Sequence, residues 1–301
     1  MKIVLALEIP IMILLILIGA LVGISMSFVG QTGQGVVVPL ILLITGDVLL
    51  AITVNLLNDF VAAISVGINY ARKKEFYFSK NILILLLISL ITSFLGVIIL
   101  ILTPLSIIFG WFLPVFIIFL GFSIISKGFP TPESLKITVH KISERISKRK
   151  KGDIIAEDIE ENGIRNMINP QSKLFFMLAS ILGIIVGFNS GLFGANSGFI
   201  ITLVLIILYG YPLKKSVGTA LILSIIMCIF TFFSYQILGF TIEGRLFFNW
   251  DFVLYLGIGS FISGLLTSNY VQKLSAKAMG RGMAMTMITL GFFSLVFYFI
   301  S

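Results

Sequence analysis

Long apolar runs separated by short polar breaks are the main pattern along the chain. Charged residues, prolines and glycines mark the breaks, and most of the runs are long enough to form helices within a membrane. Ten runs can be separated, at residues 3–29, 36–45, 48–70, 81–102, 105–126, 174–190, 198–210, 213–238, 250–269 and 282–300. The pattern therefore predicts an all-α polytopic membrane protein.

The composition agrees with this prediction. Of the 301 residues, 58% are hydrophobic and 11% are charged, whereas a soluble domain typically carries about 25% charged residues. The chain has one cysteine, Cys228, and one histidine, His140. These two residues allow no internal disulfide and no cysteine-based metal site, so we expect no metal and no cofactor. The first 23 residues resemble a signal peptide, but their apolar run continues into a glycine-rich motif without a small-residue cleavage site, which favours a membrane helix.

The basic residues are distributed unequally between the two sides of the membrane. If the ten runs cross in order, nineteen Lys and Arg residues fall on one side, and only Lys2 and Arg245 fall on the other. The basic side is expected to be cytoplasmic, which places both termini outside in a multi-pass protein of the cell (inner) membrane. This bias also accounts for the net charge of +8 without a nucleic-acid partner.

A polar stretch at residues 128–172 divides the chain into a first membrane unit, 1–127, and a second, 173–301. Within the stretch, Leu135, Val139, Ile142 and Ile146 form an apolar stripe at helical spacing, with basic residues beside it. This pattern fits an amphipathic helix on the cytoplasmic membrane surface. A solvated linker helix explains it equally well.

The two membrane units contain matching motifs. Residues 28–40 (FVGQTGQGVVVPL) resemble residues 191–203 (GLFGANSGFIITL), and residues 51–56 (AITVNL) resemble residues 216–221 (SVGTAL). We interpret the halves as copies of one unit. Each copy has about five apolar segments, an odd number, so the copies would insert as inverted repeats. Secondary transporters are commonly built this way, with the substrate site at the repeat interface.

The apolar runs that follow the two glycine motifs are too short to span a bilayer. Residues 36–45 would cover about 15 Å of a hydrocarbon core of about 30 Å. Residues 198–210 would cover about 20 Å. The sequence therefore predicts broken helices whose polar turns meet near the membrane midplane, where irregular backbone must be buried in protein or line a cavity.

Two helix starts that face each other would form an anion site without Lys or Arg, because their free N–H groups and positive dipole ends converge. Neutral polar residues in the turns and in the following helices would add donors. The predicted substrate-binding residues are Gln31, Thr32, Gly33, Gln34, Gly35, Asn55, Asn196, Ser197, Gly198 and Thr219. The alternative is that the glycines only allow close packing, while the amides bond across helices.

An acidic residue, Asp59, lies in the centre of the apolar run 48–70. An ionised carboxylate is costly at this depth, so we consider Asp59, with neighbouring Asn58, a candidate for proton or cation coupling. The alternative is a structural group that bonds to a neighbouring turn. The corresponding residue of the second half is the neutral Ser224, so the repeated unit does not require the charge.

These motifs resemble those of the sulfite exporter TauE/SafE family. The second copy is the more similar: GLFGANSGFI resembles the glycine-rich turn of the family, and Val217-Gly-Thr-Ala resembles its A-x-G-T-s element. Gln34 and Asn196-Ser197 depart from the family pattern, because they place polar side chains where the family often has glycine. The resemblance implies transport of small sulfur-containing anions such as sulfite, sulfonates or thiosulfate.

The leading interpretation is a secondary transporter of such anions that works by alternating access, with proton or sodium coupling. The chain has no GxxxxGK[ST] motif for ATP. Its expected partners are a small anion and the lipid bilayer. The sequence is also compatible with a homodimer. One alternative is a cation-coupled or neutral-solute carrier centred on Asp59. The other is an intramembrane enzyme with Cys228 as nucleophile, which is disfavoured because no span contains a histidine to activate it.

Overall fold

The structure is a computed structural model that describes residues 9–30, 33–103, 115, 118–119, 121–126, 173–194 and 198–300. Every regular element in these ranges is an α-helix. The helices of the first half are α1 (Ile9–Val29), α2 (Gln34–Thr45), α3 (Val48–Arg72) and α4 (Lys80–Leu102). The helices of the second half are α7 (Lys173–Phe193), α8 (Gly198–Ile207), α9 (Leu213–Glu243), α10 (Trp250–Val271) and α11 (Ala276–Ile300).

The helices confirm the prediction of an all-α polytopic membrane protein. Among the described residues, six helices are long and apolar enough to cross a membrane, and α2 and α8 are shorter apolar helices. The predicted run 105–126 is described only at 115, 118–119 and 121–126, which are helical. The polar stretch 128–172, with its predicted amphipathic helix, lies outside the described residues.

Polar residues and glycines end the helices where the sequence predicted breaks. Gly46 ends α2 with a φ of 67°, and its N–H donates to the carbonyl of Leu42. Asp47 then begins α3, because its carboxylate accepts hydrogen bonds from the N–H groups of Leu49 and Leu50 at 3.1 Å each. A left-handed glycine followed by an acidic N-cap is a strong stop-and-start signal for helices. This turn fixes the C-terminal end of α2.

The lengths of α2 and α8 agree with the prediction of broken helices. They have 12 and 10 residues, which correspond to about 18 Å and 15 Å at 1.5 Å per residue. A hydrocarbon core is about 30 Å thick, so neither helix can cross it alone. Helix α8 ends at Ile207, three residues before the end of the apolar run.

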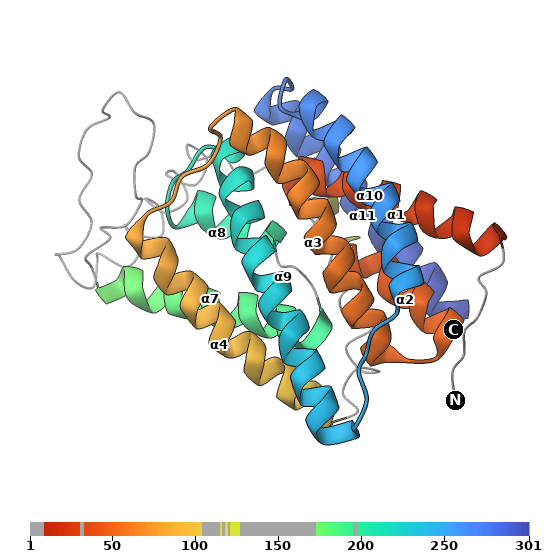
Figure 1. The fold of residues 1–301 in the computed structure, drawn as a ribbon. Helices are drawn as coiled ribbons and strands as arrows, with labels where there is room; N and C mark the ends of the chain where they lie inside the picture. Colours follow the sequence, from red (N-terminus) through yellow and green to blue (C-terminus); the bar gives the residue numbers. More distant parts are fainter. Residues whose placement is uncertain are drawn as a thin grey trace, which may run out of the picture.

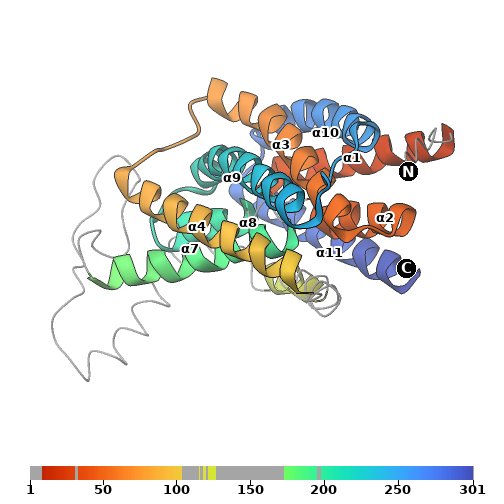
Figure 2. The same ribbon diagram turned by 60° about the horizontal axis from the view of Figure 1, so that its bottom comes forward.

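Helices α3 and α9 pack against each other in the middle of the bundle (Figures 1 and 2). Helix α2 packs on α3, and α8 packs on α9. Helix α1 packs along α10, whereas α7 packs along α4. Each half therefore places its first helix against the fourth helix of the other half.

Small residues allow close approach in the pairs α1–α10 and α4–α7. A Cβ atom on Gly19 of α1 would lie 2.1 Å from the carbonyl oxygen of Leu256 in α10. A Cβ atom on Gly187 of α7 would lie 1.9 Å from Oγ1 of Thr92 in α4. Close helix packing through small residues is common in membranes, where dispersion contacts replace the hydrophobic drive.

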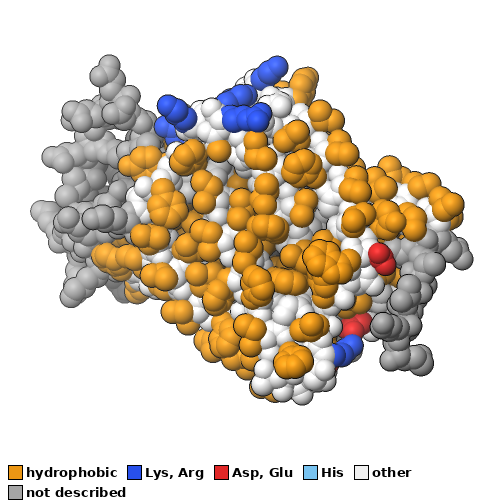
Figure 3. Space-filling view, in the orientation of Figure 1, with side chains coloured by type: hydrophobic (Ala, Val, Ile, Leu, Met, Phe, Trp, Pro, Cys, Tyr) orange, Lys and Arg blue, Asp and Glu red, His pale blue; other side chains and the backbone are white. Residues whose placement is uncertain are grey.

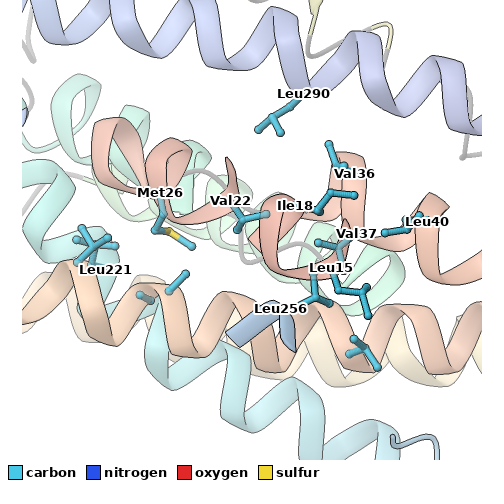
Figure 4. Close-up of a cluster of buried hydrophobic side chains, with 14 of the residues drawn as sticks. Leu15, Ile18, Val22, Met26, Val36, Val37, Leu40, Leu221, Leu256 and Leu290 are labelled. Carbon is cyan, nitrogen blue, oxygen red and sulfur yellow. The ribbon is translucent and has the colours of Figure 1, made fainter. Parts of the chain in front are cut away.

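The largest apolar core joins α1, α2, α3 and α10 around the short helix α2 (Figure 4). Leu15 and Val22 of α1 and Val37 of α2 have no exposed surface, and neither does Leu256 of α10. The core therefore holds α2 in position along its length.

On the face shown in Figure 3, the exposed Lys and Arg side chains lie at the two ends of the molecule, and hydrophobic side chains cover most of the surface between them. One end, where α3 and α10 finish and α9 begins, carries basic residues and is called the basic end below. Its residues are Arg72, Lys73, Lys74, Lys214, Lys215, Lys273, Lys277 and Arg281. At the opposite end, Arg245 pairs with Asp47 at 2.7 Å and with Glu243 at 3.0 Å.

Candidate functional site

The two glycine motifs lie against each other in the interior, where the end of α1 meets the start of α8. Gly30, which precedes α2, has a φ of 69°, and Gly198 is the first residue of α8. A Cβ atom on Gly198 would lie 2.1 Å from the carbonyl oxygen of Gly30. Any larger residue at position 198 would collide with that backbone. The structure thus brings together the two glycine motifs that the sequence identified.

A buried carboxylate accepts a backbone hydrogen bond at the start of α2. The N–H of Gly33, the N-cap residue, donates to Oδ1 of Asp59 at 2.8 Å. The amide nitrogen of Asn55 donates to Oδ2 of the same carboxylate at 3.3 Å. Asp59 has no exposed surface. A buried carboxylate at a helix start is stabilised by the N–H group and by the positive end of the helix dipole.

Asn55 connects this carboxylate with the turn before α8. Its side-chain nitrogen also donates to the carbonyl of Gly194 at 2.9 Å, and Gly194 has a φ of 61°. Asn55 is fully buried. One amide of α3 therefore contacts the polar elements of both turns, and its removal would affect both.

Two further buried polar side chains lie in the central helices α3 and α9. Ser224 of α9 is fully buried, and its Oγ lies 3.0 Å from the position that a Cβ atom on Gly198 would take. Asn58 of α3 is also fully buried. Within the described residues, neither the Ser224 hydroxyl nor the two polar atoms of Asn58 have a hydrogen-bond partner. Because an unpaired buried polar group costs about 1–3 kcal/mol, both residues are candidates for ligand contact.

The predicted site residues divide into three groups. Gly33, Asn55, Asp59 and Gly198 lie at the two turns, and Gln34 and Gly35 form the buried first turn of α2. Gln31, Thr32, Asn196 and Ser197 lie outside the described residues. Thr219 contacts a different element, the 73–79 segment that connects α3 and α4.

Thr219 bonds to this segment close to the basic end. Its Oγ1 accepts a hydrogen bond from the N–H of Tyr77 at 2.9 Å. The same hydroxyl donates to the carbonyl of Lys215 at 2.7 Å. This geometry indicates that Thr219 holds the connection over the start of α9. Sequence reasoning placed Thr219 in the site from the repeat alone, which carries no information on where a connecting segment crosses.

Sequence reasoning also missed Ser224 as a site residue. The alignment of the halves had paired it with Asp59, but its lack of charge made it look unimportant. Among the described residues, no group of three or more His, Cys, Asp or Glu side chains could hold a metal ion. The polar chemistry near the two turns therefore consists of one carboxylate, amides, hydroxyls and backbone.

Comparison with known proteins gives one match. The family model of the sulfite exporter TauE/SafE matches residues 15–294, which is nearly the whole chain and includes both glycine motifs. No curated protein matches the chain, and no solved structure matches it. The family match confirms the resemblance that the motifs indicated.

Proposed function

Because the chain belongs to the sulfite exporter TauE/SafE family, a family of membrane transporters for sulfite-type anions, we propose that it carries a small sulfur-containing anion by alternating access. Sulfite, a sulfonate or thiosulfate is the expected substrate class. The observation that carries the proposal is that the two glycine motifs meet at Gly30 and Gly198, while Asn55 and Asp59 link the start of α2 to the turn before α8. Two converging helix starts provide N–H donors and positive partial charge in the interior without Lys or Arg.

The reciprocal helix pairing supports an inverted-repeat mechanism. Helix α1 packs on α10 as α7 packs on α4, and α2 packs on α3 as α8 packs on α9. Such pairing is expected when two halves are related by a two-fold axis in the membrane plane, with the site at their interface. Rocking of one half against the other would then expose the site to each side in turn.

We further propose that the basic end faces the cytoplasm and that both termini lie outside. The described Lys and Arg residues gather at the basic end, and Arg245 at the opposite end is paired with acidic residues. This distribution follows the positive-inside rule. The 128–172 linker would then be cytoplasmic.

Asp59 is the candidate for proton or sodium coupling in this proposal. Both of its oxygens accept hydrogen bonds from neutral groups, Gly33 N–H and the Asn55 amide. A substrate anion nearby would be repelled by the carboxylate, so protonation or cation binding at Asp59 would favour anion binding. The alternative, a cation or neutral-solute carrier centred on Asp59, uses the same carboxylate as the main ligand.

Replacement of Asp59 by Asn separates these two functions. An anion carrier should bind its anion at least as tightly in Asp59→Asn, because the repelling charge is removed. A cation carrier should lose cation binding. The measurement is the ligand-induced shift in melting temperature of the purified protein, because a ligand that binds only the folded state stabilises it by RT ln(1 + [L]/Kd).

The panel contains sulfite, sulfate, thiosulfate, taurine, sulfoacetate, a carboxylate and several cations, and it is repeated with Gln34→Leu and Asn196→Leu. A shift with a sulfur anion that both variants lose would support a site formed by both turns. Shifts with cations or neutral solutes alone would contradict the anion proposal and favour the alternative.

A further inference from the structure

The two helix starts are faced by side chains of different chemistry. The residue that faces the start of α2 is Asp59, which follows Gly33 by 26 residues. Ser224 takes the place of Asp59 when residues 51–56 are aligned with residues 216–221, and it lies beside the start of α8. The matching positions in the two halves therefore hold a carboxylate in one case and a hydroxyl in the other.

The start of α2 already has a side-chain acceptor. Asp59 accepts the Gly33 N–H directly at 2.8 Å, and it is fully buried. A substrate oxyanion at this place would have to displace the carboxylate and leave it buried beside the substrate. The displaced carboxyl group would lose its backbone donor, and an unpaired buried polar group costs about 1–3 kcal/mol, so the start of α2 is unsuited to the substrate.

Among the described residues, no acidic side chain of α8 or α9 caps the start of α8 as Asp59 caps the start of α2, although Asn55 links Asp59 to the turn before α8. Helix α8 contains no Asp or Glu, and α9 contains none from Leu213 to Ile242. The side chain that points to Gly198 is the hydroxyl of Ser224, which is fully buried and has no hydrogen-bond partner within the described residues. Most buried polar groups in native proteins are paired, so an unpaired hydroxyl needs an explanation.

We propose that the substrate oxyanion binds at the start of α8, where the Ser224 hydroxyl donates a hydrogen bond to it, while Asp59 fills the equivalent place at the start of α2. This inference rests on the proposed function, and it replaces a symmetric two-turn site by a single anion subsite. The first turn of a helix offers N–H groups without intrahelical acceptors, and the hydroxyl adds one donor. These donors suit a small deprotonated oxyanion.

The glycine at position 198 fits this arrangement. The approach of Gly30 leaves no room for a side chain on α8 at its first residue, so the backbone itself and Ser224 from the neighbouring helix must supply the contacts. The chemistry of the subsite is therefore set mainly by one side chain of α9, which makes it open to a direct test.

The test measures affinities for thiosulfate and for sulfite by titration calorimetry with the full chain in detergent. Ser224→Ala removes the hydroxyl, and we expect the dissociation constant to rise about 10- to 100-fold, as for loss of a hydrogen bond to a charged group. Ser224→Asp places a carboxylate at the start of α8, as Asp59 does at α2, and should abolish anion binding. Ser234→Ala is the matched control, since Ser234 is also buried in α9 but donates to the carbonyl of Phe230 at 2.8 Å.

The outcomes separate this inference from the proposed function. If the wild-type protein binds neither anion, nor any other anion of the panel, the proposed function fails and the inference fails with it. If the wild-type protein binds an anion and Ser224→Ala binds it equally well, the inference is overturned and the transporter proposal stands. Ser224→Ala decides the question even if Ser224→Asp does not fold, because it removes atoms and adds none.

Discussion

A glycine with a left-handed φ precedes both α2 and α8, Gly30 at 69° and Gly194 at 61°, but the polar groups near the two helix starts have different hydrogen-bond partners. At α2, the N-cap N–H, a carboxylate and an amide bond to one another. At α8, the facing hydroxyl of Ser224 has no partner within the described part of the chain. Glycines in the two motifs allow the helices to meet closely. The side chain that faces each helix start differs, and this difference determines whether the protein itself or a ligand supplies the hydrogen-bond partner.

The largest effect on stability should come from a substitution that separates the two turns. In Gly198→Ala the new Cβ would lie 2.1 Å from the carbonyl oxygen of Gly30, and two backbones must move apart to relieve this contact. We expect the free energy of unfolding to fall by about 3 kcal/mol. Thermal unfolding of the detergent-purified protein, with size-exclusion chromatography, measures the effect.

The control for this substitution is Gly67→Ala in α3. A Cβ atom there would meet only Cδ1 of Ile225, at 3.9 Å, and alanine is a better helix former than glycine by about 1 kcal/mol. Gly67→Ala should be as stable as the wild-type protein or more stable. Wild-type stability of Gly198→Ala would show that the turns are not in contact.

The next largest effect should come from the carboxylate at the start of α2. Asp59→Leu leaves the Gly33 N–H without its acceptor, and we expect a loss of about 2 kcal/mol in the free energy of unfolding. Asp59→Asn keeps an oxygen that can accept this bond, so its loss should be less than half as large. Chemical or thermal unfolding of both variants at neutral pH tests the difference. Equal stability of Asp59→Leu and the wild-type protein would contradict the role of Asp59 as the cap of α2.

Most of the helices could be predicted from the sequence because polar residues interrupt the apolar runs at the helix ends. The predicted runs 36–45 and 48–70 agree with α2 and α3 within two residues at each end, since Gly46 and Asp47 stop one helix and cap the next. The end of α9 was predicted less well. This helix continues past residue 238 to Glu243 because the apolar pattern has no strong break before Gly244.

The pairing of the two turns could also be predicted, because matching motifs on half-length helices leave few places for a polar break. The partners of individual side chains could not. For Asp59 the sequence left two interpretations open, a coupling residue and a structural group that bonds to a neighbouring turn. The hydrogen bond from Gly33 is of the second kind, but the sequence did not identify Gly33 as the partner. The bonds of Thr219 to Tyr77 depend on the path of a connecting segment, which hydropathy does not specify.

A smaller effect is expected from the carboxylate that caps α3 at the surface. Asp47 accepts from Leu49 and Leu50 as Asp59 accepts from Gly33, but it is partly exposed to solvent. We expect Asp47→Ala to cost about 1 kcal/mol, as for other N-caps. The control is Arg245→Gln, which breaks the ion pair with Asp47 and should change stability little because Arg245 is largely exposed. A larger loss in Asp47→Ala than in Asp59→Leu would mean that burial does not strengthen the cap of α2.

The smallest effect should follow the removal of the hydroxyl at the start of α8. Without ligand, Ser224→Ala loses no bond to the described residues, so its stability should stay within about 0.5 kcal/mol of the wild-type protein. Ser93→Ala is the matched comparison, since Ser93 is equally buried but its Oγ lies 2.7 Å from Oγ1 of Thr231. Loss of that bond should cost about 1 kcal/mol. Thermal unfolding without ligand compares the two variants, and an equal loss in both would mean that Ser224 already has a partner in the protein and is not a free donor at α8.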